Sequence, residues 1–319
     1  MSYRPFTSIL AKDMNEFVTY KHAQGDEYDS GQRVLWYFDN FLLKNGYDRP
    51  DLTHDILARY AAAQRHLSKN TQYGRLAVSR VFARWLSRLI PGSAIIEDIA
   101  VKRPALPRYY LYSSDEIMAI IQAARQVKGD QMGSCLATLI GLLYATGLRI
   151  GEALALNVDD IDLAMGRLTV KRGKLGKARN VVLSATTVVA LGKYLDFRFE
   201  RRPTGKEAPI FINRHGKRLK YECVSQAFRS ILRSRKIGVG ALLAPRLHDL
   251  RHTYACDCLR KWYAEGVDVN ARLPILATAM GHVHINNTQL YLHVTAQLLQ
   301  VAADRFHETF NNNCKGKNQ

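Results

Sequence analysis

Tyr291 is the residue whose chemistry most needs help from other parts of the chain. A tyrosine hydroxyl can attack phosphorus, but its pKa of about 10 means that cationic or basic neighbours must activate it at neutral pH. Three earlier segments supply such groups, one around Arg149, one around Lys174 and one around His248 and Arg251. The chemistry to consider is therefore attack of a phenol on a phosphate ester.

Each of these segments also has an ordinary explanation when it is taken alone. Arg149 lies in ATGLRIGEAL, three residues before Glu152, so the two share a helical face and could form a simple local ion pair. His248 and Arg251, in LHDLRHTYA, are spaced i, i+3 on one expected helix and can address one anion. So short a pattern also arises by chance.

The sequence GKLGKAR, residues 173–179, is the expected glycine-rich tip of a β-hairpin. Lys174 on such a tip can enter a groove and donate a proton, and Lys177 and Arg179 are further candidates for phosphate contact. The alternative is that these are ordinary surface cations on a flexible loop.

Tyr291 lies in MGHVHINNTQLYLHV, where Gly281 and His282 precede it. A glycine before the histidine predicts a sharp helix end that presents the imidazole at a cleft, and Asn286 or Asn287 can cap a helix that carries the tyrosine. The alternative is a core tyrosine with a satisfied hydroxyl.

The charge of the chain favours a polyanionic partner such as nucleic acid. The formal net charge is +18 over 319 residues, and residues 198–236 alone carry twelve Lys or Arg against three acids. Residues 65–88 hold no Asp or Glu and six basic side chains, namely Arg65, Lys69, Arg75, Arg80, Arg84 and Arg88. Two local basic surfaces suit a protein that grips DNA from two sides.

Other features of the composition limit the possible classes of protein. No run of 18 apolar residues predicts a membrane span, and the N-terminus lacks a signal-peptide pattern, so we expect a cytoplasmic, nucleoid-associated protein. We expect no cofactor, and a metal site is not expected because the cysteines are odd in number and lack zinc-site spacing. They are Cys135, Cys223, Cys256, Cys258 and Cys314.

The first part of the chain, residues 1–106, reads as helical, and its expected helices cover 8–23, 30–45, 51–64 and 70–90. Ser30 and Thr53 are the expected N-caps of the second and third helices. In the fourth, we expect an apolar face of Val78, Val81, Phe82, Trp85 and Leu89. The opposite face carries Arg80, Arg84 and Arg88, which we expect, with Arg75, to contact DNA.

A proline-containing basic segment with Lys102 and Arg103 predicts a DNA-contacting linker, with the domain boundary at 107–112. The second domain, 113–310, is predicted as helices with a small β-sheet, starting at a capping signal, SSDEI. Residues 166–171 and 179–184 form its hairpin, and 210–212 a further short strand. We expect a last helix at 296–310 and a disordered tail at 311–319.

In their order along the chain, these motifs resemble the tyrosine recombinase, or phage integrase, family. The resemblance covers about residues 113–310 and rests on ATGLRIGEAL, the hairpin lysine, LHDLRHTYA and MGHVHINNTQLYLHV. It implies an α+β catalytic domain behind a helical, SAM-like core-binding domain, which together form a C-shaped clamp on DNA. It further implies a homo-tetramer on double-stranded DNA at specific recombination sites, alone or with other recombinase subunits, and a terminal helix that docks on a neighbour.

The resemblance also implies a role for each motif residue. Tyr291 would be the nucleophile, Arg149 and Arg251 would hold the scissile phosphate, and His282 would hydrogen-bond it. His248 would assist proton removal, Lys174 would protonate the leaving 5′-oxygen, and Glu152 would support Arg149. Fixed cationic donors around a phosphate that gains charge are physically sensible, and no metal is then required.

The implied reaction is site-specific recombination through a 3′-phosphotyrosyl intermediate and a Holliday junction. Val182 stands where the family often has proline, and the segment between Arg251 and Gly281 is longer than in compact members that resolve chromosome dimers. That length favours an integrase of a transposon or other mobile element. The alternatives are a type IB topoisomerase, which shares this chemistry, and a non-catalytic DNA-binding accessory protein.

Overall fold

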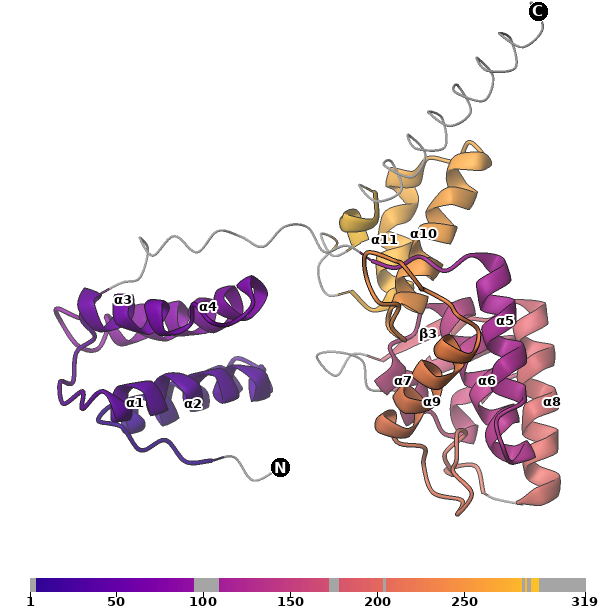
Figure 1. Ribbon diagram of the computed structural model, residues 1–319, viewed down its shortest axis with the longest axis horizontal. Coiled ribbons are helices and arrows are strands. Elements are labelled where there is room, and N and C mark those ends of the chain that lie inside the picture. The colour runs from indigo at the N-terminus through magenta and orange to yellow at the C-terminus, as the bar shows by residue number, and fades with distance from the viewer. Residues whose placement is uncertain are drawn as a thin grey trace, which may run out of the picture. The chain divides into compact units, whose positions relative to one another are not determined.

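The structure, a computed structural model, describes residues 4–94, 109–171, 178–202, 205–282, 285 and 288–292. The chain divides into two compact units, Met1–Pro107 and Arg108–Gln319 (Figure 1). The expected linker residues Lys102 and Arg103, the hairpin lysines Lys174 and Lys177, and the expected last helix all lie outside the described residues.

The N-terminal unit is built from helices, as predicted. Its helices are α1 (Ala11–Ala23), α2 (Asp29–Lys44), α3 (His54–Ala63) and α4 (Lys69–Leu86). Aromatic side chains fill its core, where Phe17 and Phe82 meet edge to face with ring centroids 5.5 Å apart. The buried carboxylate of Asp39 accepts hydrogen bonds from the backbone N–H groups of Thr7 and Ser8, which ties the chain entry to α2.

Of the two N-caps predicted in this unit, one is confirmed and one is wrong. Thr53 is confirmed as the N-cap of α3, because its hydroxyl accepts the N–H of Ile56. Ser30 is not an N-cap: α2 begins one residue earlier, after Tyr28, which takes a left-handed conformation with φ of 48°. Tyr28 packs against the core, which sets the helix start in place of a side-chain cap.

The buried face of α4 is rotated from the one predicted. Val81 and Leu89 are 41% and 54% exposed, whereas Leu76, Phe82 and Leu86 are fully buried. The helix ends at Leu86, so Leu89 is not part of the stripe, and the buried residues follow the i, i+3, i+4 spacing from Leu76.

The C-terminal unit is mainly helical, with one small sheet. Its helices are α5 (Ser114–Arg125), α6 (Asp130–Thr146), α7 (Ile150–Ala155), the 3-10 turn η1 (Val158–Asp160), α8 (Ala185–Arg201), α9 (Tyr221–Ser234), α10 (Asp249–Ala264) and α11 (Val269–Met280). Ser113 and Glu116 form the capping box that the sequence predicts at the start of α5. None of the helices within the described ranges is long and apolar enough to cross a membrane.

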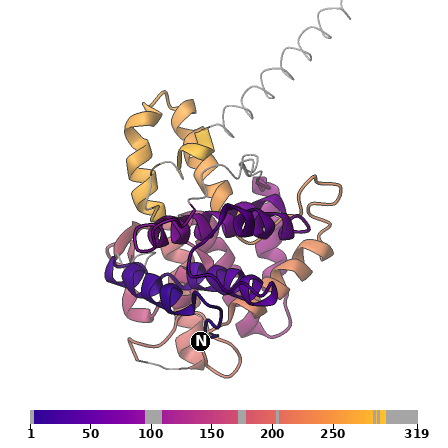
Figure 2. The same ribbon diagram turned by 90° about the vertical axis from the view of Figure 1, so that its left-hand side faces the viewer.

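Helix α6 is the centre of this unit. It is apolar on most sides, with Leu136, Leu139, Ile140 and Leu143 buried, and it packs against α5, α8 and α10. Helices α10 and α11 lie side by side at one end of the unit (Figures 1 and 2). They enclose a separate apolar cluster that includes Leu259 and Tyr291.

The sheet has three antiparallel strands in the order β1 (Ile161–Asp162), β2 (Arg167–Val170) and β3 (Arg179–Val182). Strands β2 and β3 confirm the predicted hairpin, with Leu168 opposite Val181 and both side chains in the core. The strand predicted at 210–212 is reduced to isolated bridges, of which one joins Ile212 to Arg218.

Candidate active site

The turn between α6 and α7 sets the position of Arg149. Gly147 ends α6 with φ of 63°, and a Cβ atom there would come within 2.3 Å of the Tyr254 ring, so the tight turn needs glycine. Arg149 becomes the N-cap residue of α7. Glu152 accepts both the backbone N–H and the guanidinium Nη1 of Arg149, each at 3.0 Å, and thereby orients the side chain.

Glu152 also binds a second arginine, which the sequence did not pair with it. Arg179 donates Nη1 and Nη2 to the two carboxylate oxygens at 3.0 and 2.7 Å, and both side chains are buried. Burial would raise the pKa of Glu152, but the hydrogen bonds from Arg179 and Arg149 lower it below its usual value. In the described structure Arg179, an expected DNA contact, thus helps to hold the site together.

Three arginines bind three successive carbonyl groups where α11 ends. Arg179 donates Nε to the Ala279 carbonyl at 3.0 Å, Arg251 donates Nη2 to that of Met280 at 2.7 Å, and Arg149 donates Nη2 to that of Gly281 at 3.0 Å. The last carbonyls of a helix have no partner within the helix, and they carry its partial negative charge. The end of α11 thus gathers the guanidinium groups into one cluster.

Gly281 makes this arrangement possible, as the predicted sharp helix end requires. It has φ of 66°, and a Cβ atom at this position would meet the Arg179 guanidinium at 2.7 Å. A side chain here would strain the backbone and displace Arg179.

Arg251 lies deepest in the cluster, with an exposed fraction of 3%. It spans two helix ends, because its Nη1 also donates to the Gly147 carbonyl at 2.5 Å, at the end of α6. Burial and the nearby charge of Arg149 lower the pKa of Arg251 to about 10, so the guanidinium is still cationic at neutral pH. The described bonds use two of its five N–H donors.

Two of the predicted histidines border this cluster. His282 bonds through Nδ1 to the buried hydroxyl of Thr288 at 2.7 Å, which fixes its ring. Burial and the charge of Arg251 lower the pKa of His282 to about 3, so the ring is neutral. His248 precedes α10, and burial and the same arginine also lower its pKa.

Tyr291 completes the group, but it is buried, with an exposed fraction of only 3%. Its hydroxyl lies 2.9 Å from Nδ1 of His252, and its ring stacks near that of His282 at a centroid distance of 6.3 Å. Burial raises the pKa of Tyr291, although the charge of Arg251 opposes that shift. In this conformation the phenol is therefore protonated at neutral pH.

His252 is the neighbour that sequence reasoning missed. It follows Arg251 directly, and neighbouring residues on a helix point in directions about 100° apart, so the motif gave no reason to group it with the site. Its only sequence signal is its place in LHDLRHTYA.

Five motif residues thus lie in one region, between the ends of α6 and α11 and the start of α10, where their charges shift one another's pKa values. They are Arg149, His248, Arg251, His282 and Tyr291. The same ordered set agrees with a known family. The pattern that defines the phage integrase family matches residues 111–297. The chain belongs to this family. It is a tyrosine-type site-specific recombinase, an enzyme that breaks and rejoins DNA.

Individual relatives cover nearly the whole recombinase. The Sinorhizobium fredii (strain NBRC 101917 / NGR234) protein y4rB, named an integrase/recombinase, is 32% identical over 93% of this chain and 97% of its own length. The tyrosine recombinase XerC of Pelotomaculum thermopropionicum is 31% identical over 90% of this chain and 94% of its own length.

Solved structures share the fold of the recombinase. A XerH site-specific recombinase bound to its difH substrate matches with a TM-score of 0.68 and 20% identity, over 86% of this chain and 78% of that one. The Tn1549 transposon integrase, in complex with transposon right end DNA, matches with a TM-score of 0.66 and 14% identity, over 93% and 99%. The predicted fold class, mainly helical with a small sheet, is confirmed.

The arginines of the N-terminal unit differ in their availability. Arg75 stacks on the Tyr37 ring, with its guanidinium carbon 3.7 Å from the centroid, and donates to Gln64. Arg80 is half-buried, whereas Arg84 and Arg88 are exposed. Arg84 and Arg88 are therefore the most exposed arginines of the predicted row.

No group of three or more His, Cys, Asp or Glu side chains is placed to hold a metal ion among the residues that the structure describes.

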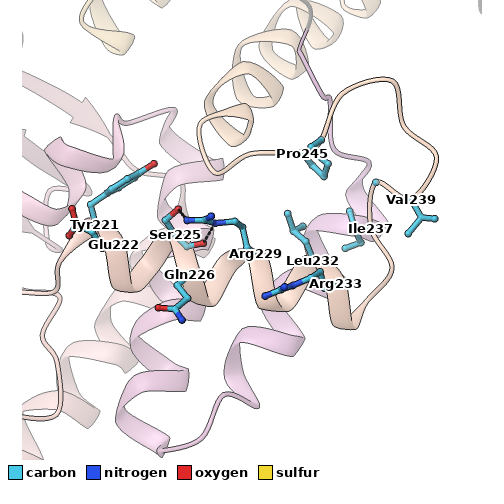
Figure 3. Close-up of a pocket in the computed structure, with 12 residues that line it drawn as sticks. Tyr221, Glu222, Ser225, Gln226, Arg229, Leu232, Arg233, Ile237, Val239 and Pro245 are labelled. Atoms are coloured by element: carbon cyan, nitrogen blue, oxygen red, sulfur yellow. Dashed lines mark hydrogen bonds between the residues drawn. The ribbon is translucent and has the colours of Figure 1, made fainter.

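A groove lies apart from the arginine cluster. It has a volume of about 740 Å³ and runs between α9 and the segment that follows it, where Val239 and Pro245 lie opposite Arg229 and Arg233 (Figure 3). None of the predicted site residues lines this groove.

Proposed function

We propose that this recombinase cleaves DNA by attack of the Tyr291 hydroxyl on a phosphodiester. The attack gives a 3′-phosphotyrosyl bond and releases a 5′-hydroxyl end, and strand exchange then passes through a Holliday junction. The observation that carries the proposal is that Tyr291 lies beside the His282 ring and within the electrostatic influence of Arg251 and Arg149, with both guanidinium groups held by backbone carbonyls.

The two arginines suit a phosphate that gains negative charge during attack. A guanidinium group binds phosphate oxygens in a planar, bidentate way, and donors that are already fixed need no rearrangement as charge develops. Arg149 is fixed by Glu152 and Gly281, and Arg251 by Gly147 and Met280. His282, fixed by Thr288, is the further hydrogen-bond donor to the phosphate.

Lys174 is our candidate for the acid that protonates the leaving 5′-oxygen. The hairpin that carries it is joined to the arginine cluster, because Arg179 at the start of β3 binds both Glu152 and the end of α11. An alkoxide is a poor leaving group, so a positioned proton donor contributes strongly. Glu152 acts indirectly, by holding Arg149 and Arg179.

The wider setting is also a proposal. We assign the two units to a core-binding domain and a catalytic domain that together enclose double-stranded DNA, with Arg80, Arg84 and Arg88 on phosphates. We propose assembly as a homo-tetramer on two DNA sites at the nucleoid, and a role in moving a mobile element. The name of the Sinorhizobium relative and the fold shared with a transposon integrase support that role.

A suicide DNA substrate tests the nucleophile. Such a substrate loses a short fragment on cleavage, so the covalent protein–DNA complex accumulates and can be counted on a denaturing gel. The wild-type chain is expected to trap DNA, and Tyr291→Phe, which keeps the buried ring, is expected to trap none. Equal trapping by both proteins contradicts the assignment, and relaxation of supercoiled DNA without joining between two sites favours a topoisomerase.

A further inference from the structure

The oxygen atom of Tyr291 that would attack DNA contacts His252. The Tyr291 hydroxyl lies 2.9 Å from Nδ1 of His252, within ordinary hydrogen-bond range. His248, to which the family resemblance assigns proton removal, meets His252 with its ring edge-on at a centroid distance of 4.9 Å. In the described contacts, the imidazole nitrogen at the reacting oxygen therefore belongs to His252.

The ring of His252 is held in place on several sides. Tyr109 stacks on its face, with ring centroids 3.7 Å apart and planes inclined by 26°. The residue is 7% exposed and lies in the first turns of α10, which packs on α6. A ring fixed in this way can receive a proton along one direction without first being ordered.

Burial and the charges around His252 together set its protonation state. The titratable or cationic groups that face it from α10, from the segment before α10, from the chain after α11 and from the start of this unit are Tyr109, Arg246, His248, Arg251, His282 and Tyr291. Burial lowers the pKa of His252 to about 3, and the electrostatic effects of His248, Arg246, Arg251 and His282 add to that shift. The ring is therefore neutral, and Nδ1 can accept the hydrogen bond from the phenol.

We propose that His252 accepts the proton of Tyr291 when Tyr291 attacks the scissile phosphate. In this step the Tyr291 O–H bond breaks and its proton moves to Nδ1 of His252, while the Tyr291 O–P bond forms. The P–O5′ bond breaks, and the 5′-oxygen leaves with a proton from the general acid, for which Lys174 is our candidate. The proposal rests on the function proposed above and adds a catalytic residue to it.

The bound phosphate would make His252 a better base than it is in the free protein. Burial, His248 and Arg246 lower the pKa of His252 most, and Arg251, which adds to that shift, is also a group that would bind a phosphate anion. An anion beside Arg251 offsets its part of the field, so protonation of His252 becomes easier once DNA is in place. The phenol is then activated only beside its substrate, which protects the free enzyme from futile chemistry.

The test compares His252→Asn with His248→Asn on the suicide substrate in single-turnover cleavage. Asparagine at position 252 can accept the phenol hydrogen bond through its amide oxygen, but it cannot take a proton. We expect His252→Asn to cleave about 100-fold more slowly, the lower end of the usual effect of a general base. DNA binding, measured in parallel, is expected to stay within threefold of wild type.

A second arm separates proton transfer from positioning. Difluorotyrosine at position 291 has a more acidic phenol and so depends less on a base. We expect it to restore at least tenfold of the loss in His252→Asn and nothing in His248→Asn. The fall in the wild-type cleavage rate at low pH, seen when the rate is plotted against pH, should also be absent in His252→Asn.

Each outcome decides the proposal. Cleavage by His252→Asn within threefold of wild type, or a defect that difluorotyrosine leaves unchanged, overturns it and leaves His252 a positioning residue. If His252→Asn fails to bind DNA, His252→Gln replaces it in both arms. Loss of the function proposed above would look different, because Tyr291→Phe would then trap as much DNA as the wild type.

Discussion

Arginine is used in opposite ways in the two units of this recombinase. Along α4 and just after it, Arg84 and Arg88 lie at the surface of the N-terminal unit. In the C-terminal unit, Arg179 and Arg251 are buried against a carboxylate and the carbonyl groups that end helices. Exposed arginines can meet a polyanion in many arrangements, whereas buried ones are fixed before any ligand arrives. We therefore propose that exposed arginines grip the DNA and that buried arginines act in its cleavage.

Arg251→Lys should have the largest effect. Lysine keeps the charge, but its single ammonium group cannot span the Gly147 and Met280 carbonyls and still address a phosphate. We expect covalent complex formation to fall by about 100- to 1,000-fold, as for loss of one fixed donor to a transition state. Single-turnover trapping on the suicide substrate measures this rate. A rate within tenfold of wild type would contradict the role of Arg251 as a fixed donor to the phosphate.

Glu152→Gln should have an intermediate effect, on stability. It removes the charge that Arg149 and Arg179 share, and we expect the free energy of unfolding at pH 7 to fall by about 2–3 kcal/mol. Urea unfolding measures it. Glu265→Gln, at an exposed pair with Lys261, is the matched control and should change stability by less than about 0.5 kcal/mol.

The pH dependence of the Glu152→Gln difference has a definite sign. The pKa of Glu152 is lowered in the folded chain, so below its usual value of 4.5 the unfolded chain binds a proton that the folded chain resists. Wild-type stability from this group is therefore complete above about pH 4.5 and is lost as pH falls through the folded pKa. The difference in the free energy of unfolding between wild type and Glu152→Gln should therefore shrink as the pH falls over that range. A difference that stays constant would mean that the Glu152 charge does not cause it.

Arg88→Ala should have the smallest effect. The side chain is exposed, so stability should stay within about 0.5 kcal/mol of wild type. The slope of log affinity for DNA against log salt should fall by about 0.9, the value for one lost phosphate contact. An unchanged slope would mean that Arg88 does not contact DNA phosphates, and would remove it from the arginines proposed to bind DNA.

The sequence singled out several of the side chains that the structure brings together. Arg149, His248, Arg251, His282 and Tyr291 stood out because attack on a phosphate needs such groups, and the hairpin and the glycine helix ends followed from local rules. The partners were harder to foresee. Glu152 meets Arg179 from 27 residues away, and His252 meets Tyr291 from 39 residues away.

Contacts made by the backbone left no trace in the sequence at all. Nothing about Ala279 or Met280 indicates that their carbonyl oxygens bind arginines. The buried face of α4 was misjudged for a related reason, since Val81 and Leu89 are apolar but the packing of the neighbouring helices decides which apolar residues are covered. The sequence pattern predicts that a helix has an apolar face, and tertiary contacts decide which of the apolar residues are buried.

The way α11 ends has a consequence for how this enzyme can be altered by evolution or by engineering. Because the arginines bind main-chain oxygens, replacing Ala279 by another small helix-forming residue should leave the cluster intact. Inserting or deleting one residue in α11 would turn its end by about 100° and shift it by about 1.5 Å, presenting the wrong oxygens. The length of this helix is thus under stricter control than its side chains, and variants with new properties are better sought by exchange than by insertion.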